Sequence, residues 1–221
     1  MKNIIILFLV FFSLPTFAQE EVFNQYFQFS ENETYQLLAD NVNLRAQPDT
    51  KSNIIKQLPV ASKVRIIEIT KSVSEINGLR APWYKVSYSE DSKTAYLWGG
   101  FISLASENNN NKDDIVFLHG ISKIEKSTDG NSLIYIQARA IKDSKEIQKI
   151  EFKGFGSVST IRNLSLNDSK GVEGIINILK FSYSDNFCGG EFGDQVYFWD
   201  GKNFIFVKNL QSGVDAPCYS L

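Results

Sequence analysis

Apolar and polar residues alternate along several short stretches in the first half of this chain. The clearest are residues 54–58, residues 63–69 and residues 94–98, each bounded by polar turn-forming residues. Alternation with a period of two sends successive side chains to opposite faces of a strand, so each stretch predicts a half-buried β-strand. Residues 35–39, 41–45 and 83–88 are expected to be further strands of the same unit.

Turn signals separate these strands. Pro48 fixes its own φ within the polar stretch Gln47-Pro48-Asp49-Thr50, which predicts a turn. Asn77-Gly78 is a dipeptide that type I′ hairpin turns prefer, because both central residues need a positive φ. Residues 73–80 therefore predict a protruding hairpin or loop, and residues 35–104 a small all-β unit.

The second half of the chain has a similar pattern. Asp200-Gly201, between two aromatic-rich strands, is a strong hairpin signal, and Asp129-Gly130 is a weaker one. We also consider a short helix near residues 144–149. This half predicts a second, mainly antiparallel β domain over residues 115–221, a usual length for one core. Its expected strands are residues 115–118, 133–141, 147–152, 175–183, 195–199 and 203–207.

A polar stretch separates the two halves. Residues 106–114 contain no apolar side chain, so they cannot bury enough surface to fold alone. We therefore expect a linker over residues 105–114.

The first 18 residues have the pattern of a secretory signal peptide. Lys2 supplies a positive charge, residues 4–14 are almost entirely apolar, and Thr16-Phe17-Ala18 is a small-x-small cleavage signal. We expect cleavage after Ala18. An uncleaved anchor is the alternative, but a membrane span needs about 20 apolar residues. No cysteine adjoins the cleavage position, so lipid attachment is not expected. The prediction is a periplasmic or secreted protein without a membrane span.

Residues 19–34 combine acidic and aromatic side chains. Phe23, Tyr26 and Phe27 have helical spacing, which suits a short amphipathic turn that packs on the following domain. A partly ordered lead-in is the alternative, and it is the one we favour from the sequence.

Composition excludes some partners. An apolar content of 43% is ample for packed cores. The net charge is −2, and the lysines and arginines are spread along the chain, so the sequence offers no basic footprint for nucleic acid.

Three motifs of the first domain resemble a known family when taken in order. They are Val42-Asn43-Leu44-Arg45 followed by Pro48, then Trp83-Tyr84-Lys85-Val86, then Tyr96-Leu97-Trp98 with Phe101-Ile102. Together they resemble the bacterial SH3 (SH3b) domains of extracytoplasmic proteins. The resemblance implies a small, non-enzymatic β-barrel that binds cell-wall peptidoglycan or peptides. The chain departs from the family in residues 70–82 and in Trp98-Gly99-Gly100, where a ligand groove would lie.

Aromatic residues of this domain are the candidate ligand contacts, because they present rigid apolar area with a polar handle. We nominate Tyr84, Tyr96, Trp98 and Phe101. Alternation places Tyr96 and Trp98 on one face of their strand and Leu97 on the other. Filling of the barrel core is the competing role, and it is the one expected for Trp83. Arg45 is expected to be solvated or to brace a loop.

The two cysteines, Cys188 and Cys218, lie in the second domain. In an oxidising compartment, an isolated pair most simply forms a disulfide. A reactive thiol is less suitable, because a papain-like peptidase needs a His after its Cys, and the single His119 precedes both. We expect His119 to be a surface or turn residue.

No pattern predicts a catalytic residue, a metal site or a cofactor. One histidine and no cluster of cysteines or carboxylates leave no convincing zinc or calcium site. A glycosidase-like pair has candidates in Glu173, Asp185, Glu191 and Asp194, but spacing does not show that any two face each other.

The sequence therefore predicts a non-enzymatic binding or scaffolding protein of the cell envelope. Its expected partners are a wall glycan, a wall peptide or another envelope protein. Two alternatives stay open: a hydrolase of envelope polymers with the barrel as its targeting module, and a protein-binding inhibitor or immunity-type protein.

Overall fold

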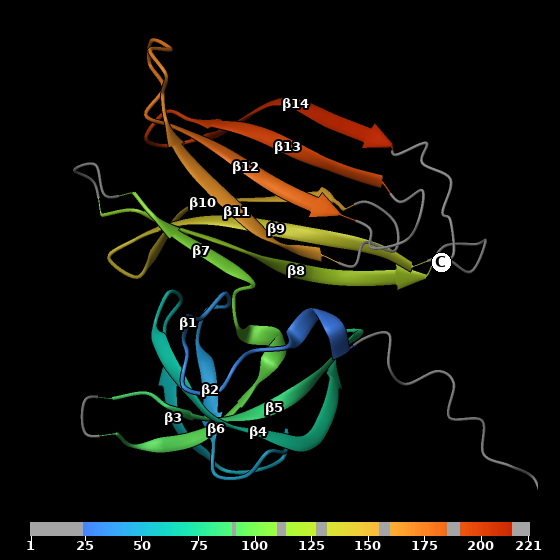
Figure 1. Cartoon of the computed structure of the whole chain (residues 1–221). Helices are drawn as coiled ribbons and strands as arrows, with labels where there is room; N and C mark the ends of the chain where they lie inside the picture. Colours follow the sequence, from blue (N-terminus) through green and yellow to red (C-terminus); the bar gives the residue numbers. More distant parts are fainter. Residues whose placement is uncertain are drawn as a thin grey trace, which may run out of the picture.

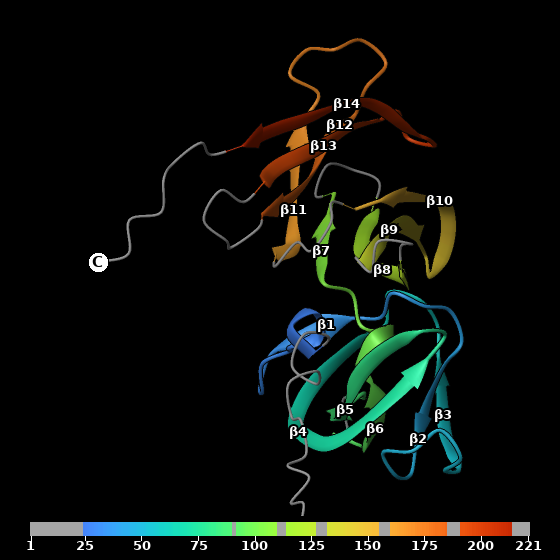
Figure 2. The ribbon, with the colours of Figure 1, turned by 90° about the vertical axis from the view of Figure 1, so that its right-hand side faces the viewer.

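The structure is a computed structural model, and it describes residues 24–89, 92–109, 114–126, 132–154, 160–184 and 191–213. In these residues it has three β-sheets stacked in layers (Figure 1). A curled six-stranded sheet forms the barrel at the bottom, and two four-stranded sheets lie above it. The view from the side shows the same order of layers (Figure 2). The predicted fold class, a small β-barrel followed by an antiparallel β domain, is confirmed.

The barrel sheet has the strand order β1-β4-β5-β6-β2-β3. Its longest strands, β4 and β5, form a hairpin whose residues Leu79 and Ala81 are part of the buried core. The turn of this hairpin is Asn77-Gly78, with φ of 52° and 75°, as the dipeptide predicted. The elements of this unit are η1 Asn24–Phe27, β1 Thr34–Gln36, β2 Val42–Arg45, β3 Ile54–Leu58, β4 Lys63–Ile76, β5 Leu79–Ser87, β6 Thr94–Trp98 and η2 Gly99–Phe101.

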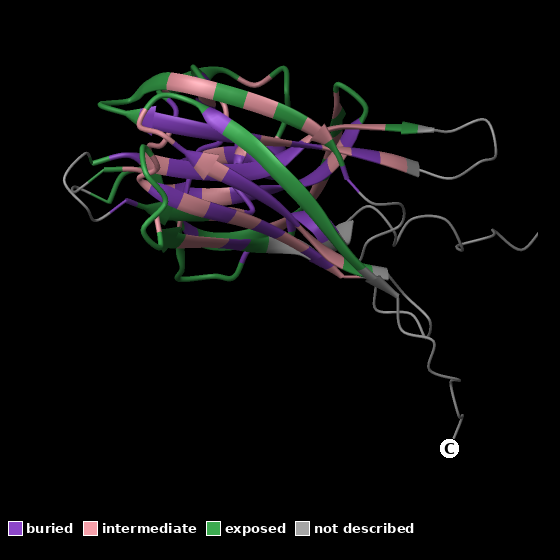
Figure 3. Ribbon diagram, turned by 90° about the horizontal axis from the view of Figure 1, so that it is seen from above, coloured by how far each residue is buried: buried purple, intermediate pink, exposed green. Residues whose placement is uncertain are grey.

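The second unit is a sandwich of two antiparallel sheets, ordered β10-β9-β8-β7 and β11-β12-β13-β14. Its core lies between the sheets, where Phe117 and Trp199 pack edge to face at 5.4 Å. Figure 3 shows buried segments along most strands, and exposed segments in the connecting loops and along one strand at the surface. The strands are β7 Ala105–Asn108, β8 Val116–Lys126, β9 Ser132–Lys142, β10 Lys145–Lys153, β11 Thr160–Asp168, β12 Asn177–Ser184, β13 Glu191–Trp199 and β14 Phe204–Gly213.

Two local predictions for the second unit are wrong. The helix considered near residues 144–149 is the start of β10, because Asp143 and Ser144 both have positive φ and form a two-residue hairpin turn. Residues 105–108, expected to be linker, are β7, which pairs with β8. The hairpin predicted at Asp200-Gly201 is confirmed, with Gly201 at a φ of 101°.

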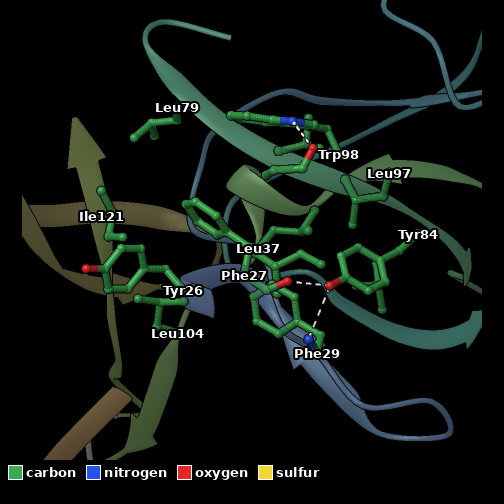
Figure 4. Packing of buried hydrophobic residues seen from close by; sticks show 14 of the residues in the cluster. Tyr26, Phe27, Phe29, Leu37, Leu79, Tyr84, Leu97, Trp98, Leu104 and Ile121 are labelled. Atoms are coloured by element: carbon green, nitrogen blue, oxygen red, sulfur yellow. Dashed lines mark hydrogen bonds between the residues drawn. The ribbon is translucent and has the colours of Figure 1, made fainter. Parts of the chain in front are cut away.

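The favoured prediction for the segment before β1 is also wrong over its described residues. Tyr26, Phe27 and Phe29 are each at most 5% exposed and belong to the barrel core. Figure 4 shows Tyr26 beside Leu104 and Ile121, where the barrel meets β8. The alternative, a turn that packs on the following domain, is the one the structure adopts, because this junction needs apolar side chains to fill it.

The side chain of Arg139 connects the barrel to the sandwich through hydrogen bonds. Arg139 of β9 is 5% exposed. Its Nη1 donates to the carbonyl of Leu38 at 2.5 Å, its Nη2 to the carboxylate of Asp40, and its Nε to Glu146 Oε2 at 2.6 Å. Beside it, Gly120 touches Leu38 so closely that an added Cβ would lie 2.5 Å from Leu38 Cδ2. The two units therefore pack in direct contact.

Candidate functional site

Tyr84, a predicted ligand contact, is a core residue. It is 1% exposed. Its hydroxyl donates to the carbonyl of Phe27 and accepts a hydrogen bond from the backbone N–H of Phe29 at 3.2 Å (Figure 4). The Phe29 ring packs edge to face on it at 5.6 Å. The two properties that made Tyr84 a candidate, its rigid apolar ring and its hydroxyl, both serve contacts inside the protein.

Trp98 is also buried, at 2% exposed. Its Nε1 donates to the carbonyls of Ser74 and Ala81, at 3.0 and 3.1 Å. Trp83 donates to Ser74 Oγ at 2.8 Å and is buried as expected. Ser74 and Ala81 belong to the β4–β5 hairpin, so this hairpin covers the two indoles and shields them from solvent.

The glycines after Trp98 permit this arrangement. A Cβ on Gly100 would lie 2.2 Å from two carbons of the Trp98 ring, and one on Gly99 would lie 2.9 Å from the Tyr84 ring. Only a residue without a side chain leaves room for these rings. The departure at Trp98-Gly99-Gly100 is therefore explained by packing.

Phe101 is half-buried and packs edge to face on Trp98, with the ring centroids 4.9 Å apart. Its carbonyl accepts a hydrogen bond from the N–H of Leu38 at 2.8 Å. Phe101 thus sits at the edge of the same aromatic cluster as Trp98, with part of its surface accessible.

Tyr96 is the predicted contact that lies on the outer face of the barrel. It is half-buried, directly opposite Lys85 of β5 on one side and Arg45 of β2 on the other. The row continues outward to Glu68 of β4 and Ile54 of β3, both exposed. Neighbouring residues in such a row have Cβ atoms about 5 Å apart, so Tyr96 is an aromatic ring between two cationic side chains.

A hydrogen bond to the loop between β2 and β3 holds the Arg45 side chain in place. Its Nη1 donates to the carbonyl of Ser52 at 2.5 Å, which braces the loop between β2 and β3 as expected. On the same face, Gln57 Nε2 donates to Asn43 Oδ1 at 3.1 Å. We name the surface formed by Asn43, Arg45, Gln57, Lys85 and Tyr96 the Tyr96 face. Its five members come from four strands. Besides the tyrosine, it presents two amide side chains and two cationic ones.

Comparison with known proteins agrees with this architecture. Residues 40–103 match the family model of the bacterial SH3 domain. The chain contains a bacterial SH3 domain. No curated protein and no solved structure matches the chain. Bacterial SH3 domains commonly bind cell-wall material or proteins, so the match indicates a binding module. None of the helices in the described residues is long and apolar enough to cross a membrane.

The SH3 domain match includes the Tyr96 face but not the sandwich. The carboxylates that the sequence offered for a glycosidase-like pair all belong to the second half of the chain. Of the four candidate carboxylates, Asp194 accepts from Ser182 Oγ at 2.6 Å and pairs with Lys180 Nζ at 3.0 Å, and Glu173 is exposed in a loop. Asp185 and the side chain of Glu191 lie outside the described residues. Among the described side chains, no three His, Cys, Asp or Glu gather as metal ligands would.

His119 is not the surface or turn residue that we expected. It lies in β8 at 1% exposed, with its ring 5.3 Å from that of Phe181 in the opposite sheet. Burial lowers the pKa of the imidazole to about 4, because desolvation disfavours the charged form. The strand predicted from the sequence ended at residue 118, one residue before His119, whereas β8 continues through His119 to Lys126.

Sequence reasoning nominated Tyr96 but none of its neighbours on the outer face of the SH3 domain. Lys85, Asn43 and Gln57 are ordinary polar residues of alternating strands, and nothing in their spacing marks them. The signal that identifies them is the strand register, since Lys85, Tyr96 and Arg45 become neighbours only when β5, β6 and β2 pair.

Proposed function

We propose that this protein is a non-enzymatic binding protein of the cell envelope, whose bacterial SH3 domain docks peptidoglycan or peptide through the Tyr96 face. The observation that carries the proposal is the placement of Tyr96 on the outer side of the barrel between Lys85 and Arg45. Tyr84 and Trp98 are not part of this proposal, because both are buried.

The chemistry of the face suits a ligand with carboxylates. An arginine guanidinium and a lysine ammonium can each pair with a carboxylate, and the arginine can do so with two parallel hydrogen bonds. A half-exposed tyrosine adds a flat apolar surface with a polar edge. Peptides, including those that cross-link cell walls, present carboxylates and apolar side chains together, so the wall peptide is the part of peptidoglycan that this face fits best.

Location outside the cytoplasm is part of the proposal. Residues 1–18 lie outside the described residues, and their sequence pattern supports a signal peptide cleaved after Ala18. Amino-terminal sequencing of the exported protein tests this, with Gln19 expected as the first residue. An exported protein that still begins at Met1 would contradict cleavage.

A disulfide between Cys188 and Cys218 is proposed for the same compartment. Both cysteines lie outside the described residues. The start of β13 and the end of β14 lie side by side, because Glu191 pairs with Gly213. Cys188 precedes Glu191 by three residues and Cys218 follows Gly213 by five, and this proximity supports the pairing.

A sedimentation assay on purified insoluble peptidoglycan tests the binding proposal. The parent protein is expected to sediment with the polymer, and Tyr96→Ala and Lys85→Glu variants to stay in the supernatant. Tyr135→Ala is the matched control, because Tyr135 is also half-buried beside a lysine, with Lys123 Nζ 4.2 Å from its ring, but lies on the sandwich. Equal sedimentation of Tyr96→Ala and parent would overturn the assignment of the face, and a parent that never sediments would overturn peptidoglycan binding.

A further inference from the structure

A β-bulge in β4 brings Glu68 to the outer face of the barrel. Ile66 of β4 pairs with Val86 of β5, so a regular register would place Glu68 opposite the buried Tyr84. The register shifts between Ile66 and Glu68, and Glu68 lies opposite Lys85 instead. Bulges of this kind bend the strand and re-aim a side chain. The bulge therefore adds an exposed carboxylate to the outer face, beside Lys85.

The charged side chains of this face are open to a ligand. Glu68 and Lys85 are direct neighbours of opposite charge, yet neither forms an ion pair within the residues that the structure describes. Over the same residues, the guanidinium of Arg45 makes one hydrogen bond, from Nη1 to the carbonyl of Ser52. Its other N–H groups are donors that a carboxylate of a ligand can use.

These charges form an ordered row across the barrel sheet. The row has one residue from each of four neighbouring strands, in the order Glu68, Lys85, Tyr96 and Arg45. Neighbouring strands lie about 4.8 Å apart, so Glu68 and Lys85 begin about 5 Å apart at their Cβ atoms. Lys85 and Arg45 are two strands apart, about 10 Å, with the tyrosine between them. A complementary ligand has an ammonium next to a carboxylate, and a second carboxylate about 10 Å away.

We propose that Glu68 determines the specificity of the Tyr96 face by selecting wall peptides with a free amino group. This inference rests on the proposed function of that face. Glu68 accepts hydrogen bonds from the ammonium of the ligand, and Lys85 pairs with the carboxylate beside it. Arg45 pairs with the second carboxylate. A peptide side chain that ends in an amino group and a carboxylate on one carbon matches the first part of this row.

Cross-linking of the wall would weaken this recognition. An amide cross-link converts the amino group of the peptide into a neutral group and leaves the carboxylate beside it unchanged. Lys85 and Arg45 attract the carboxylates of both forms, whereas Glu68 favours only the charged amine. The Tyr96 face therefore prefers peptides that are not yet cross-linked.

Acetylation of insoluble peptidoglycan tests the proposal, because acetic anhydride neutralises free amino groups and leaves the carboxylates. The full chain is expected to bind the acetylated polymer about three- to fivefold more weakly than the untreated polymer, which is the size of effect that an exposed ion pair has. In a Glu68→Gln variant this difference should disappear. Glu75→Gln is the matched control and should keep the difference, because Glu75 is also exposed on β4 but lies outside the row.

Sedimentation at fixed ionic strength, with circular dichroism to confirm folding, measures the binding of each protein to both polymers. A general effect of the charge of the polymer would act on both variants alike. Equal binding of the parent to the two polymers, or a Glu68→Gln variant that still distinguishes them, would overturn the role of Glu68 and leave the proposed function standing. A parent that binds neither polymer would overturn both.

Discussion

At the scale of single residues, the buried His119 makes the stability of the sandwich depend on pH. Its imidazole is buried among apolar side chains, and among the described residues its Nδ1 has no hydrogen-bond partner. The folded protein therefore holds the ring neutral, with a pKa of about 4 against 6.5 for an unperturbed histidine. Between these two values the unfolded chain binds more protons than the folded one.

Acid should therefore destabilise the protein through this residue. As pH falls from about 6.5 to about 4, the free energy of unfolding is expected to drop by about 3 kcal/mol on account of His119, at about 1.4 kcal/mol per pKa unit. Urea unfolding at pH 7 and pH 4 measures the drop. In a His119→Gln variant the drop should be smaller by that amount, and an equal drop in both proteins would contradict the assignment.

Arg139 should contribute more to the free energy of unfolding than its ion pairs alone would. Replacement by Met leaves the Asp40 carboxylate half in solvent, since that side chain is 55% exposed, but it removes the donor to the Leu38 carbonyl. An unsatisfied buried acceptor costs about 1–3 kcal/mol. Chemical denaturation of Arg139→Met should show a loss of this size. Lys170→Met is the control, because Lys170 and Asp168 are both more than half exposed and such pairs contribute about 0–1 kcal/mol. Equal losses would contradict the role of Arg139.

At the scale of elements, sequence patterns located strands well where alternation was strong. The bounds of β3 and β6 agree with those predicted. β12 alternates between buried and half-buried residues, and it lies within a segment that was predicted to be a strand. β7 and β11 were missed because they are rich in polar residues, and β7 is a strand only because β8 lies beside it. The burial of Trp98 was hard to predict for a related reason, since part of the hairpin that covers it, around Ser74, lies 24 residues earlier in the chain.

The proposed disulfide belongs to this scale, because it would tie the end of β14 to the loop between β12 and β13. It would close a loop of about 30 residues and add about 3–4 kcal/mol of stability in the chain-entropy model. The purified protein should therefore bind no thiol reagent until it is reduced, and its melting temperature should fall on reduction. A protein whose two cysteines react with the reagent before reduction would refute the pairing.

At the scale of the whole molecule, the barrel and the sandwich share one apolar core. This core includes Tyr26 and Trp83 of the first unit together with Ile121, Ile134 and Tyr183 of the second. Neither unit can lose its structure without exposing part of this surface. Cooperative unfolding is the expected result.

Thermal unfolding should consequently show a single transition. A Trp199→Phe variant leaves only the two barrel tryptophans, so its fluorescence reports the SH3 domain, and far-ultraviolet circular dichroism reports all the strands. Both signals should change at the same temperature. Two separate midpoints would mean that the units unfold independently.

The position of Tyr26 in this core also affects the order in which the molecule can assemble. Its neighbour Ile121 is 95 residues further along the chain, and Tyr183 is further still. Contacts of such long sequence separation make folding slow, because the intervening chain must first be brought together. A chain that emerges gradually from one end would therefore reach its final packing only after most of the second unit had appeared.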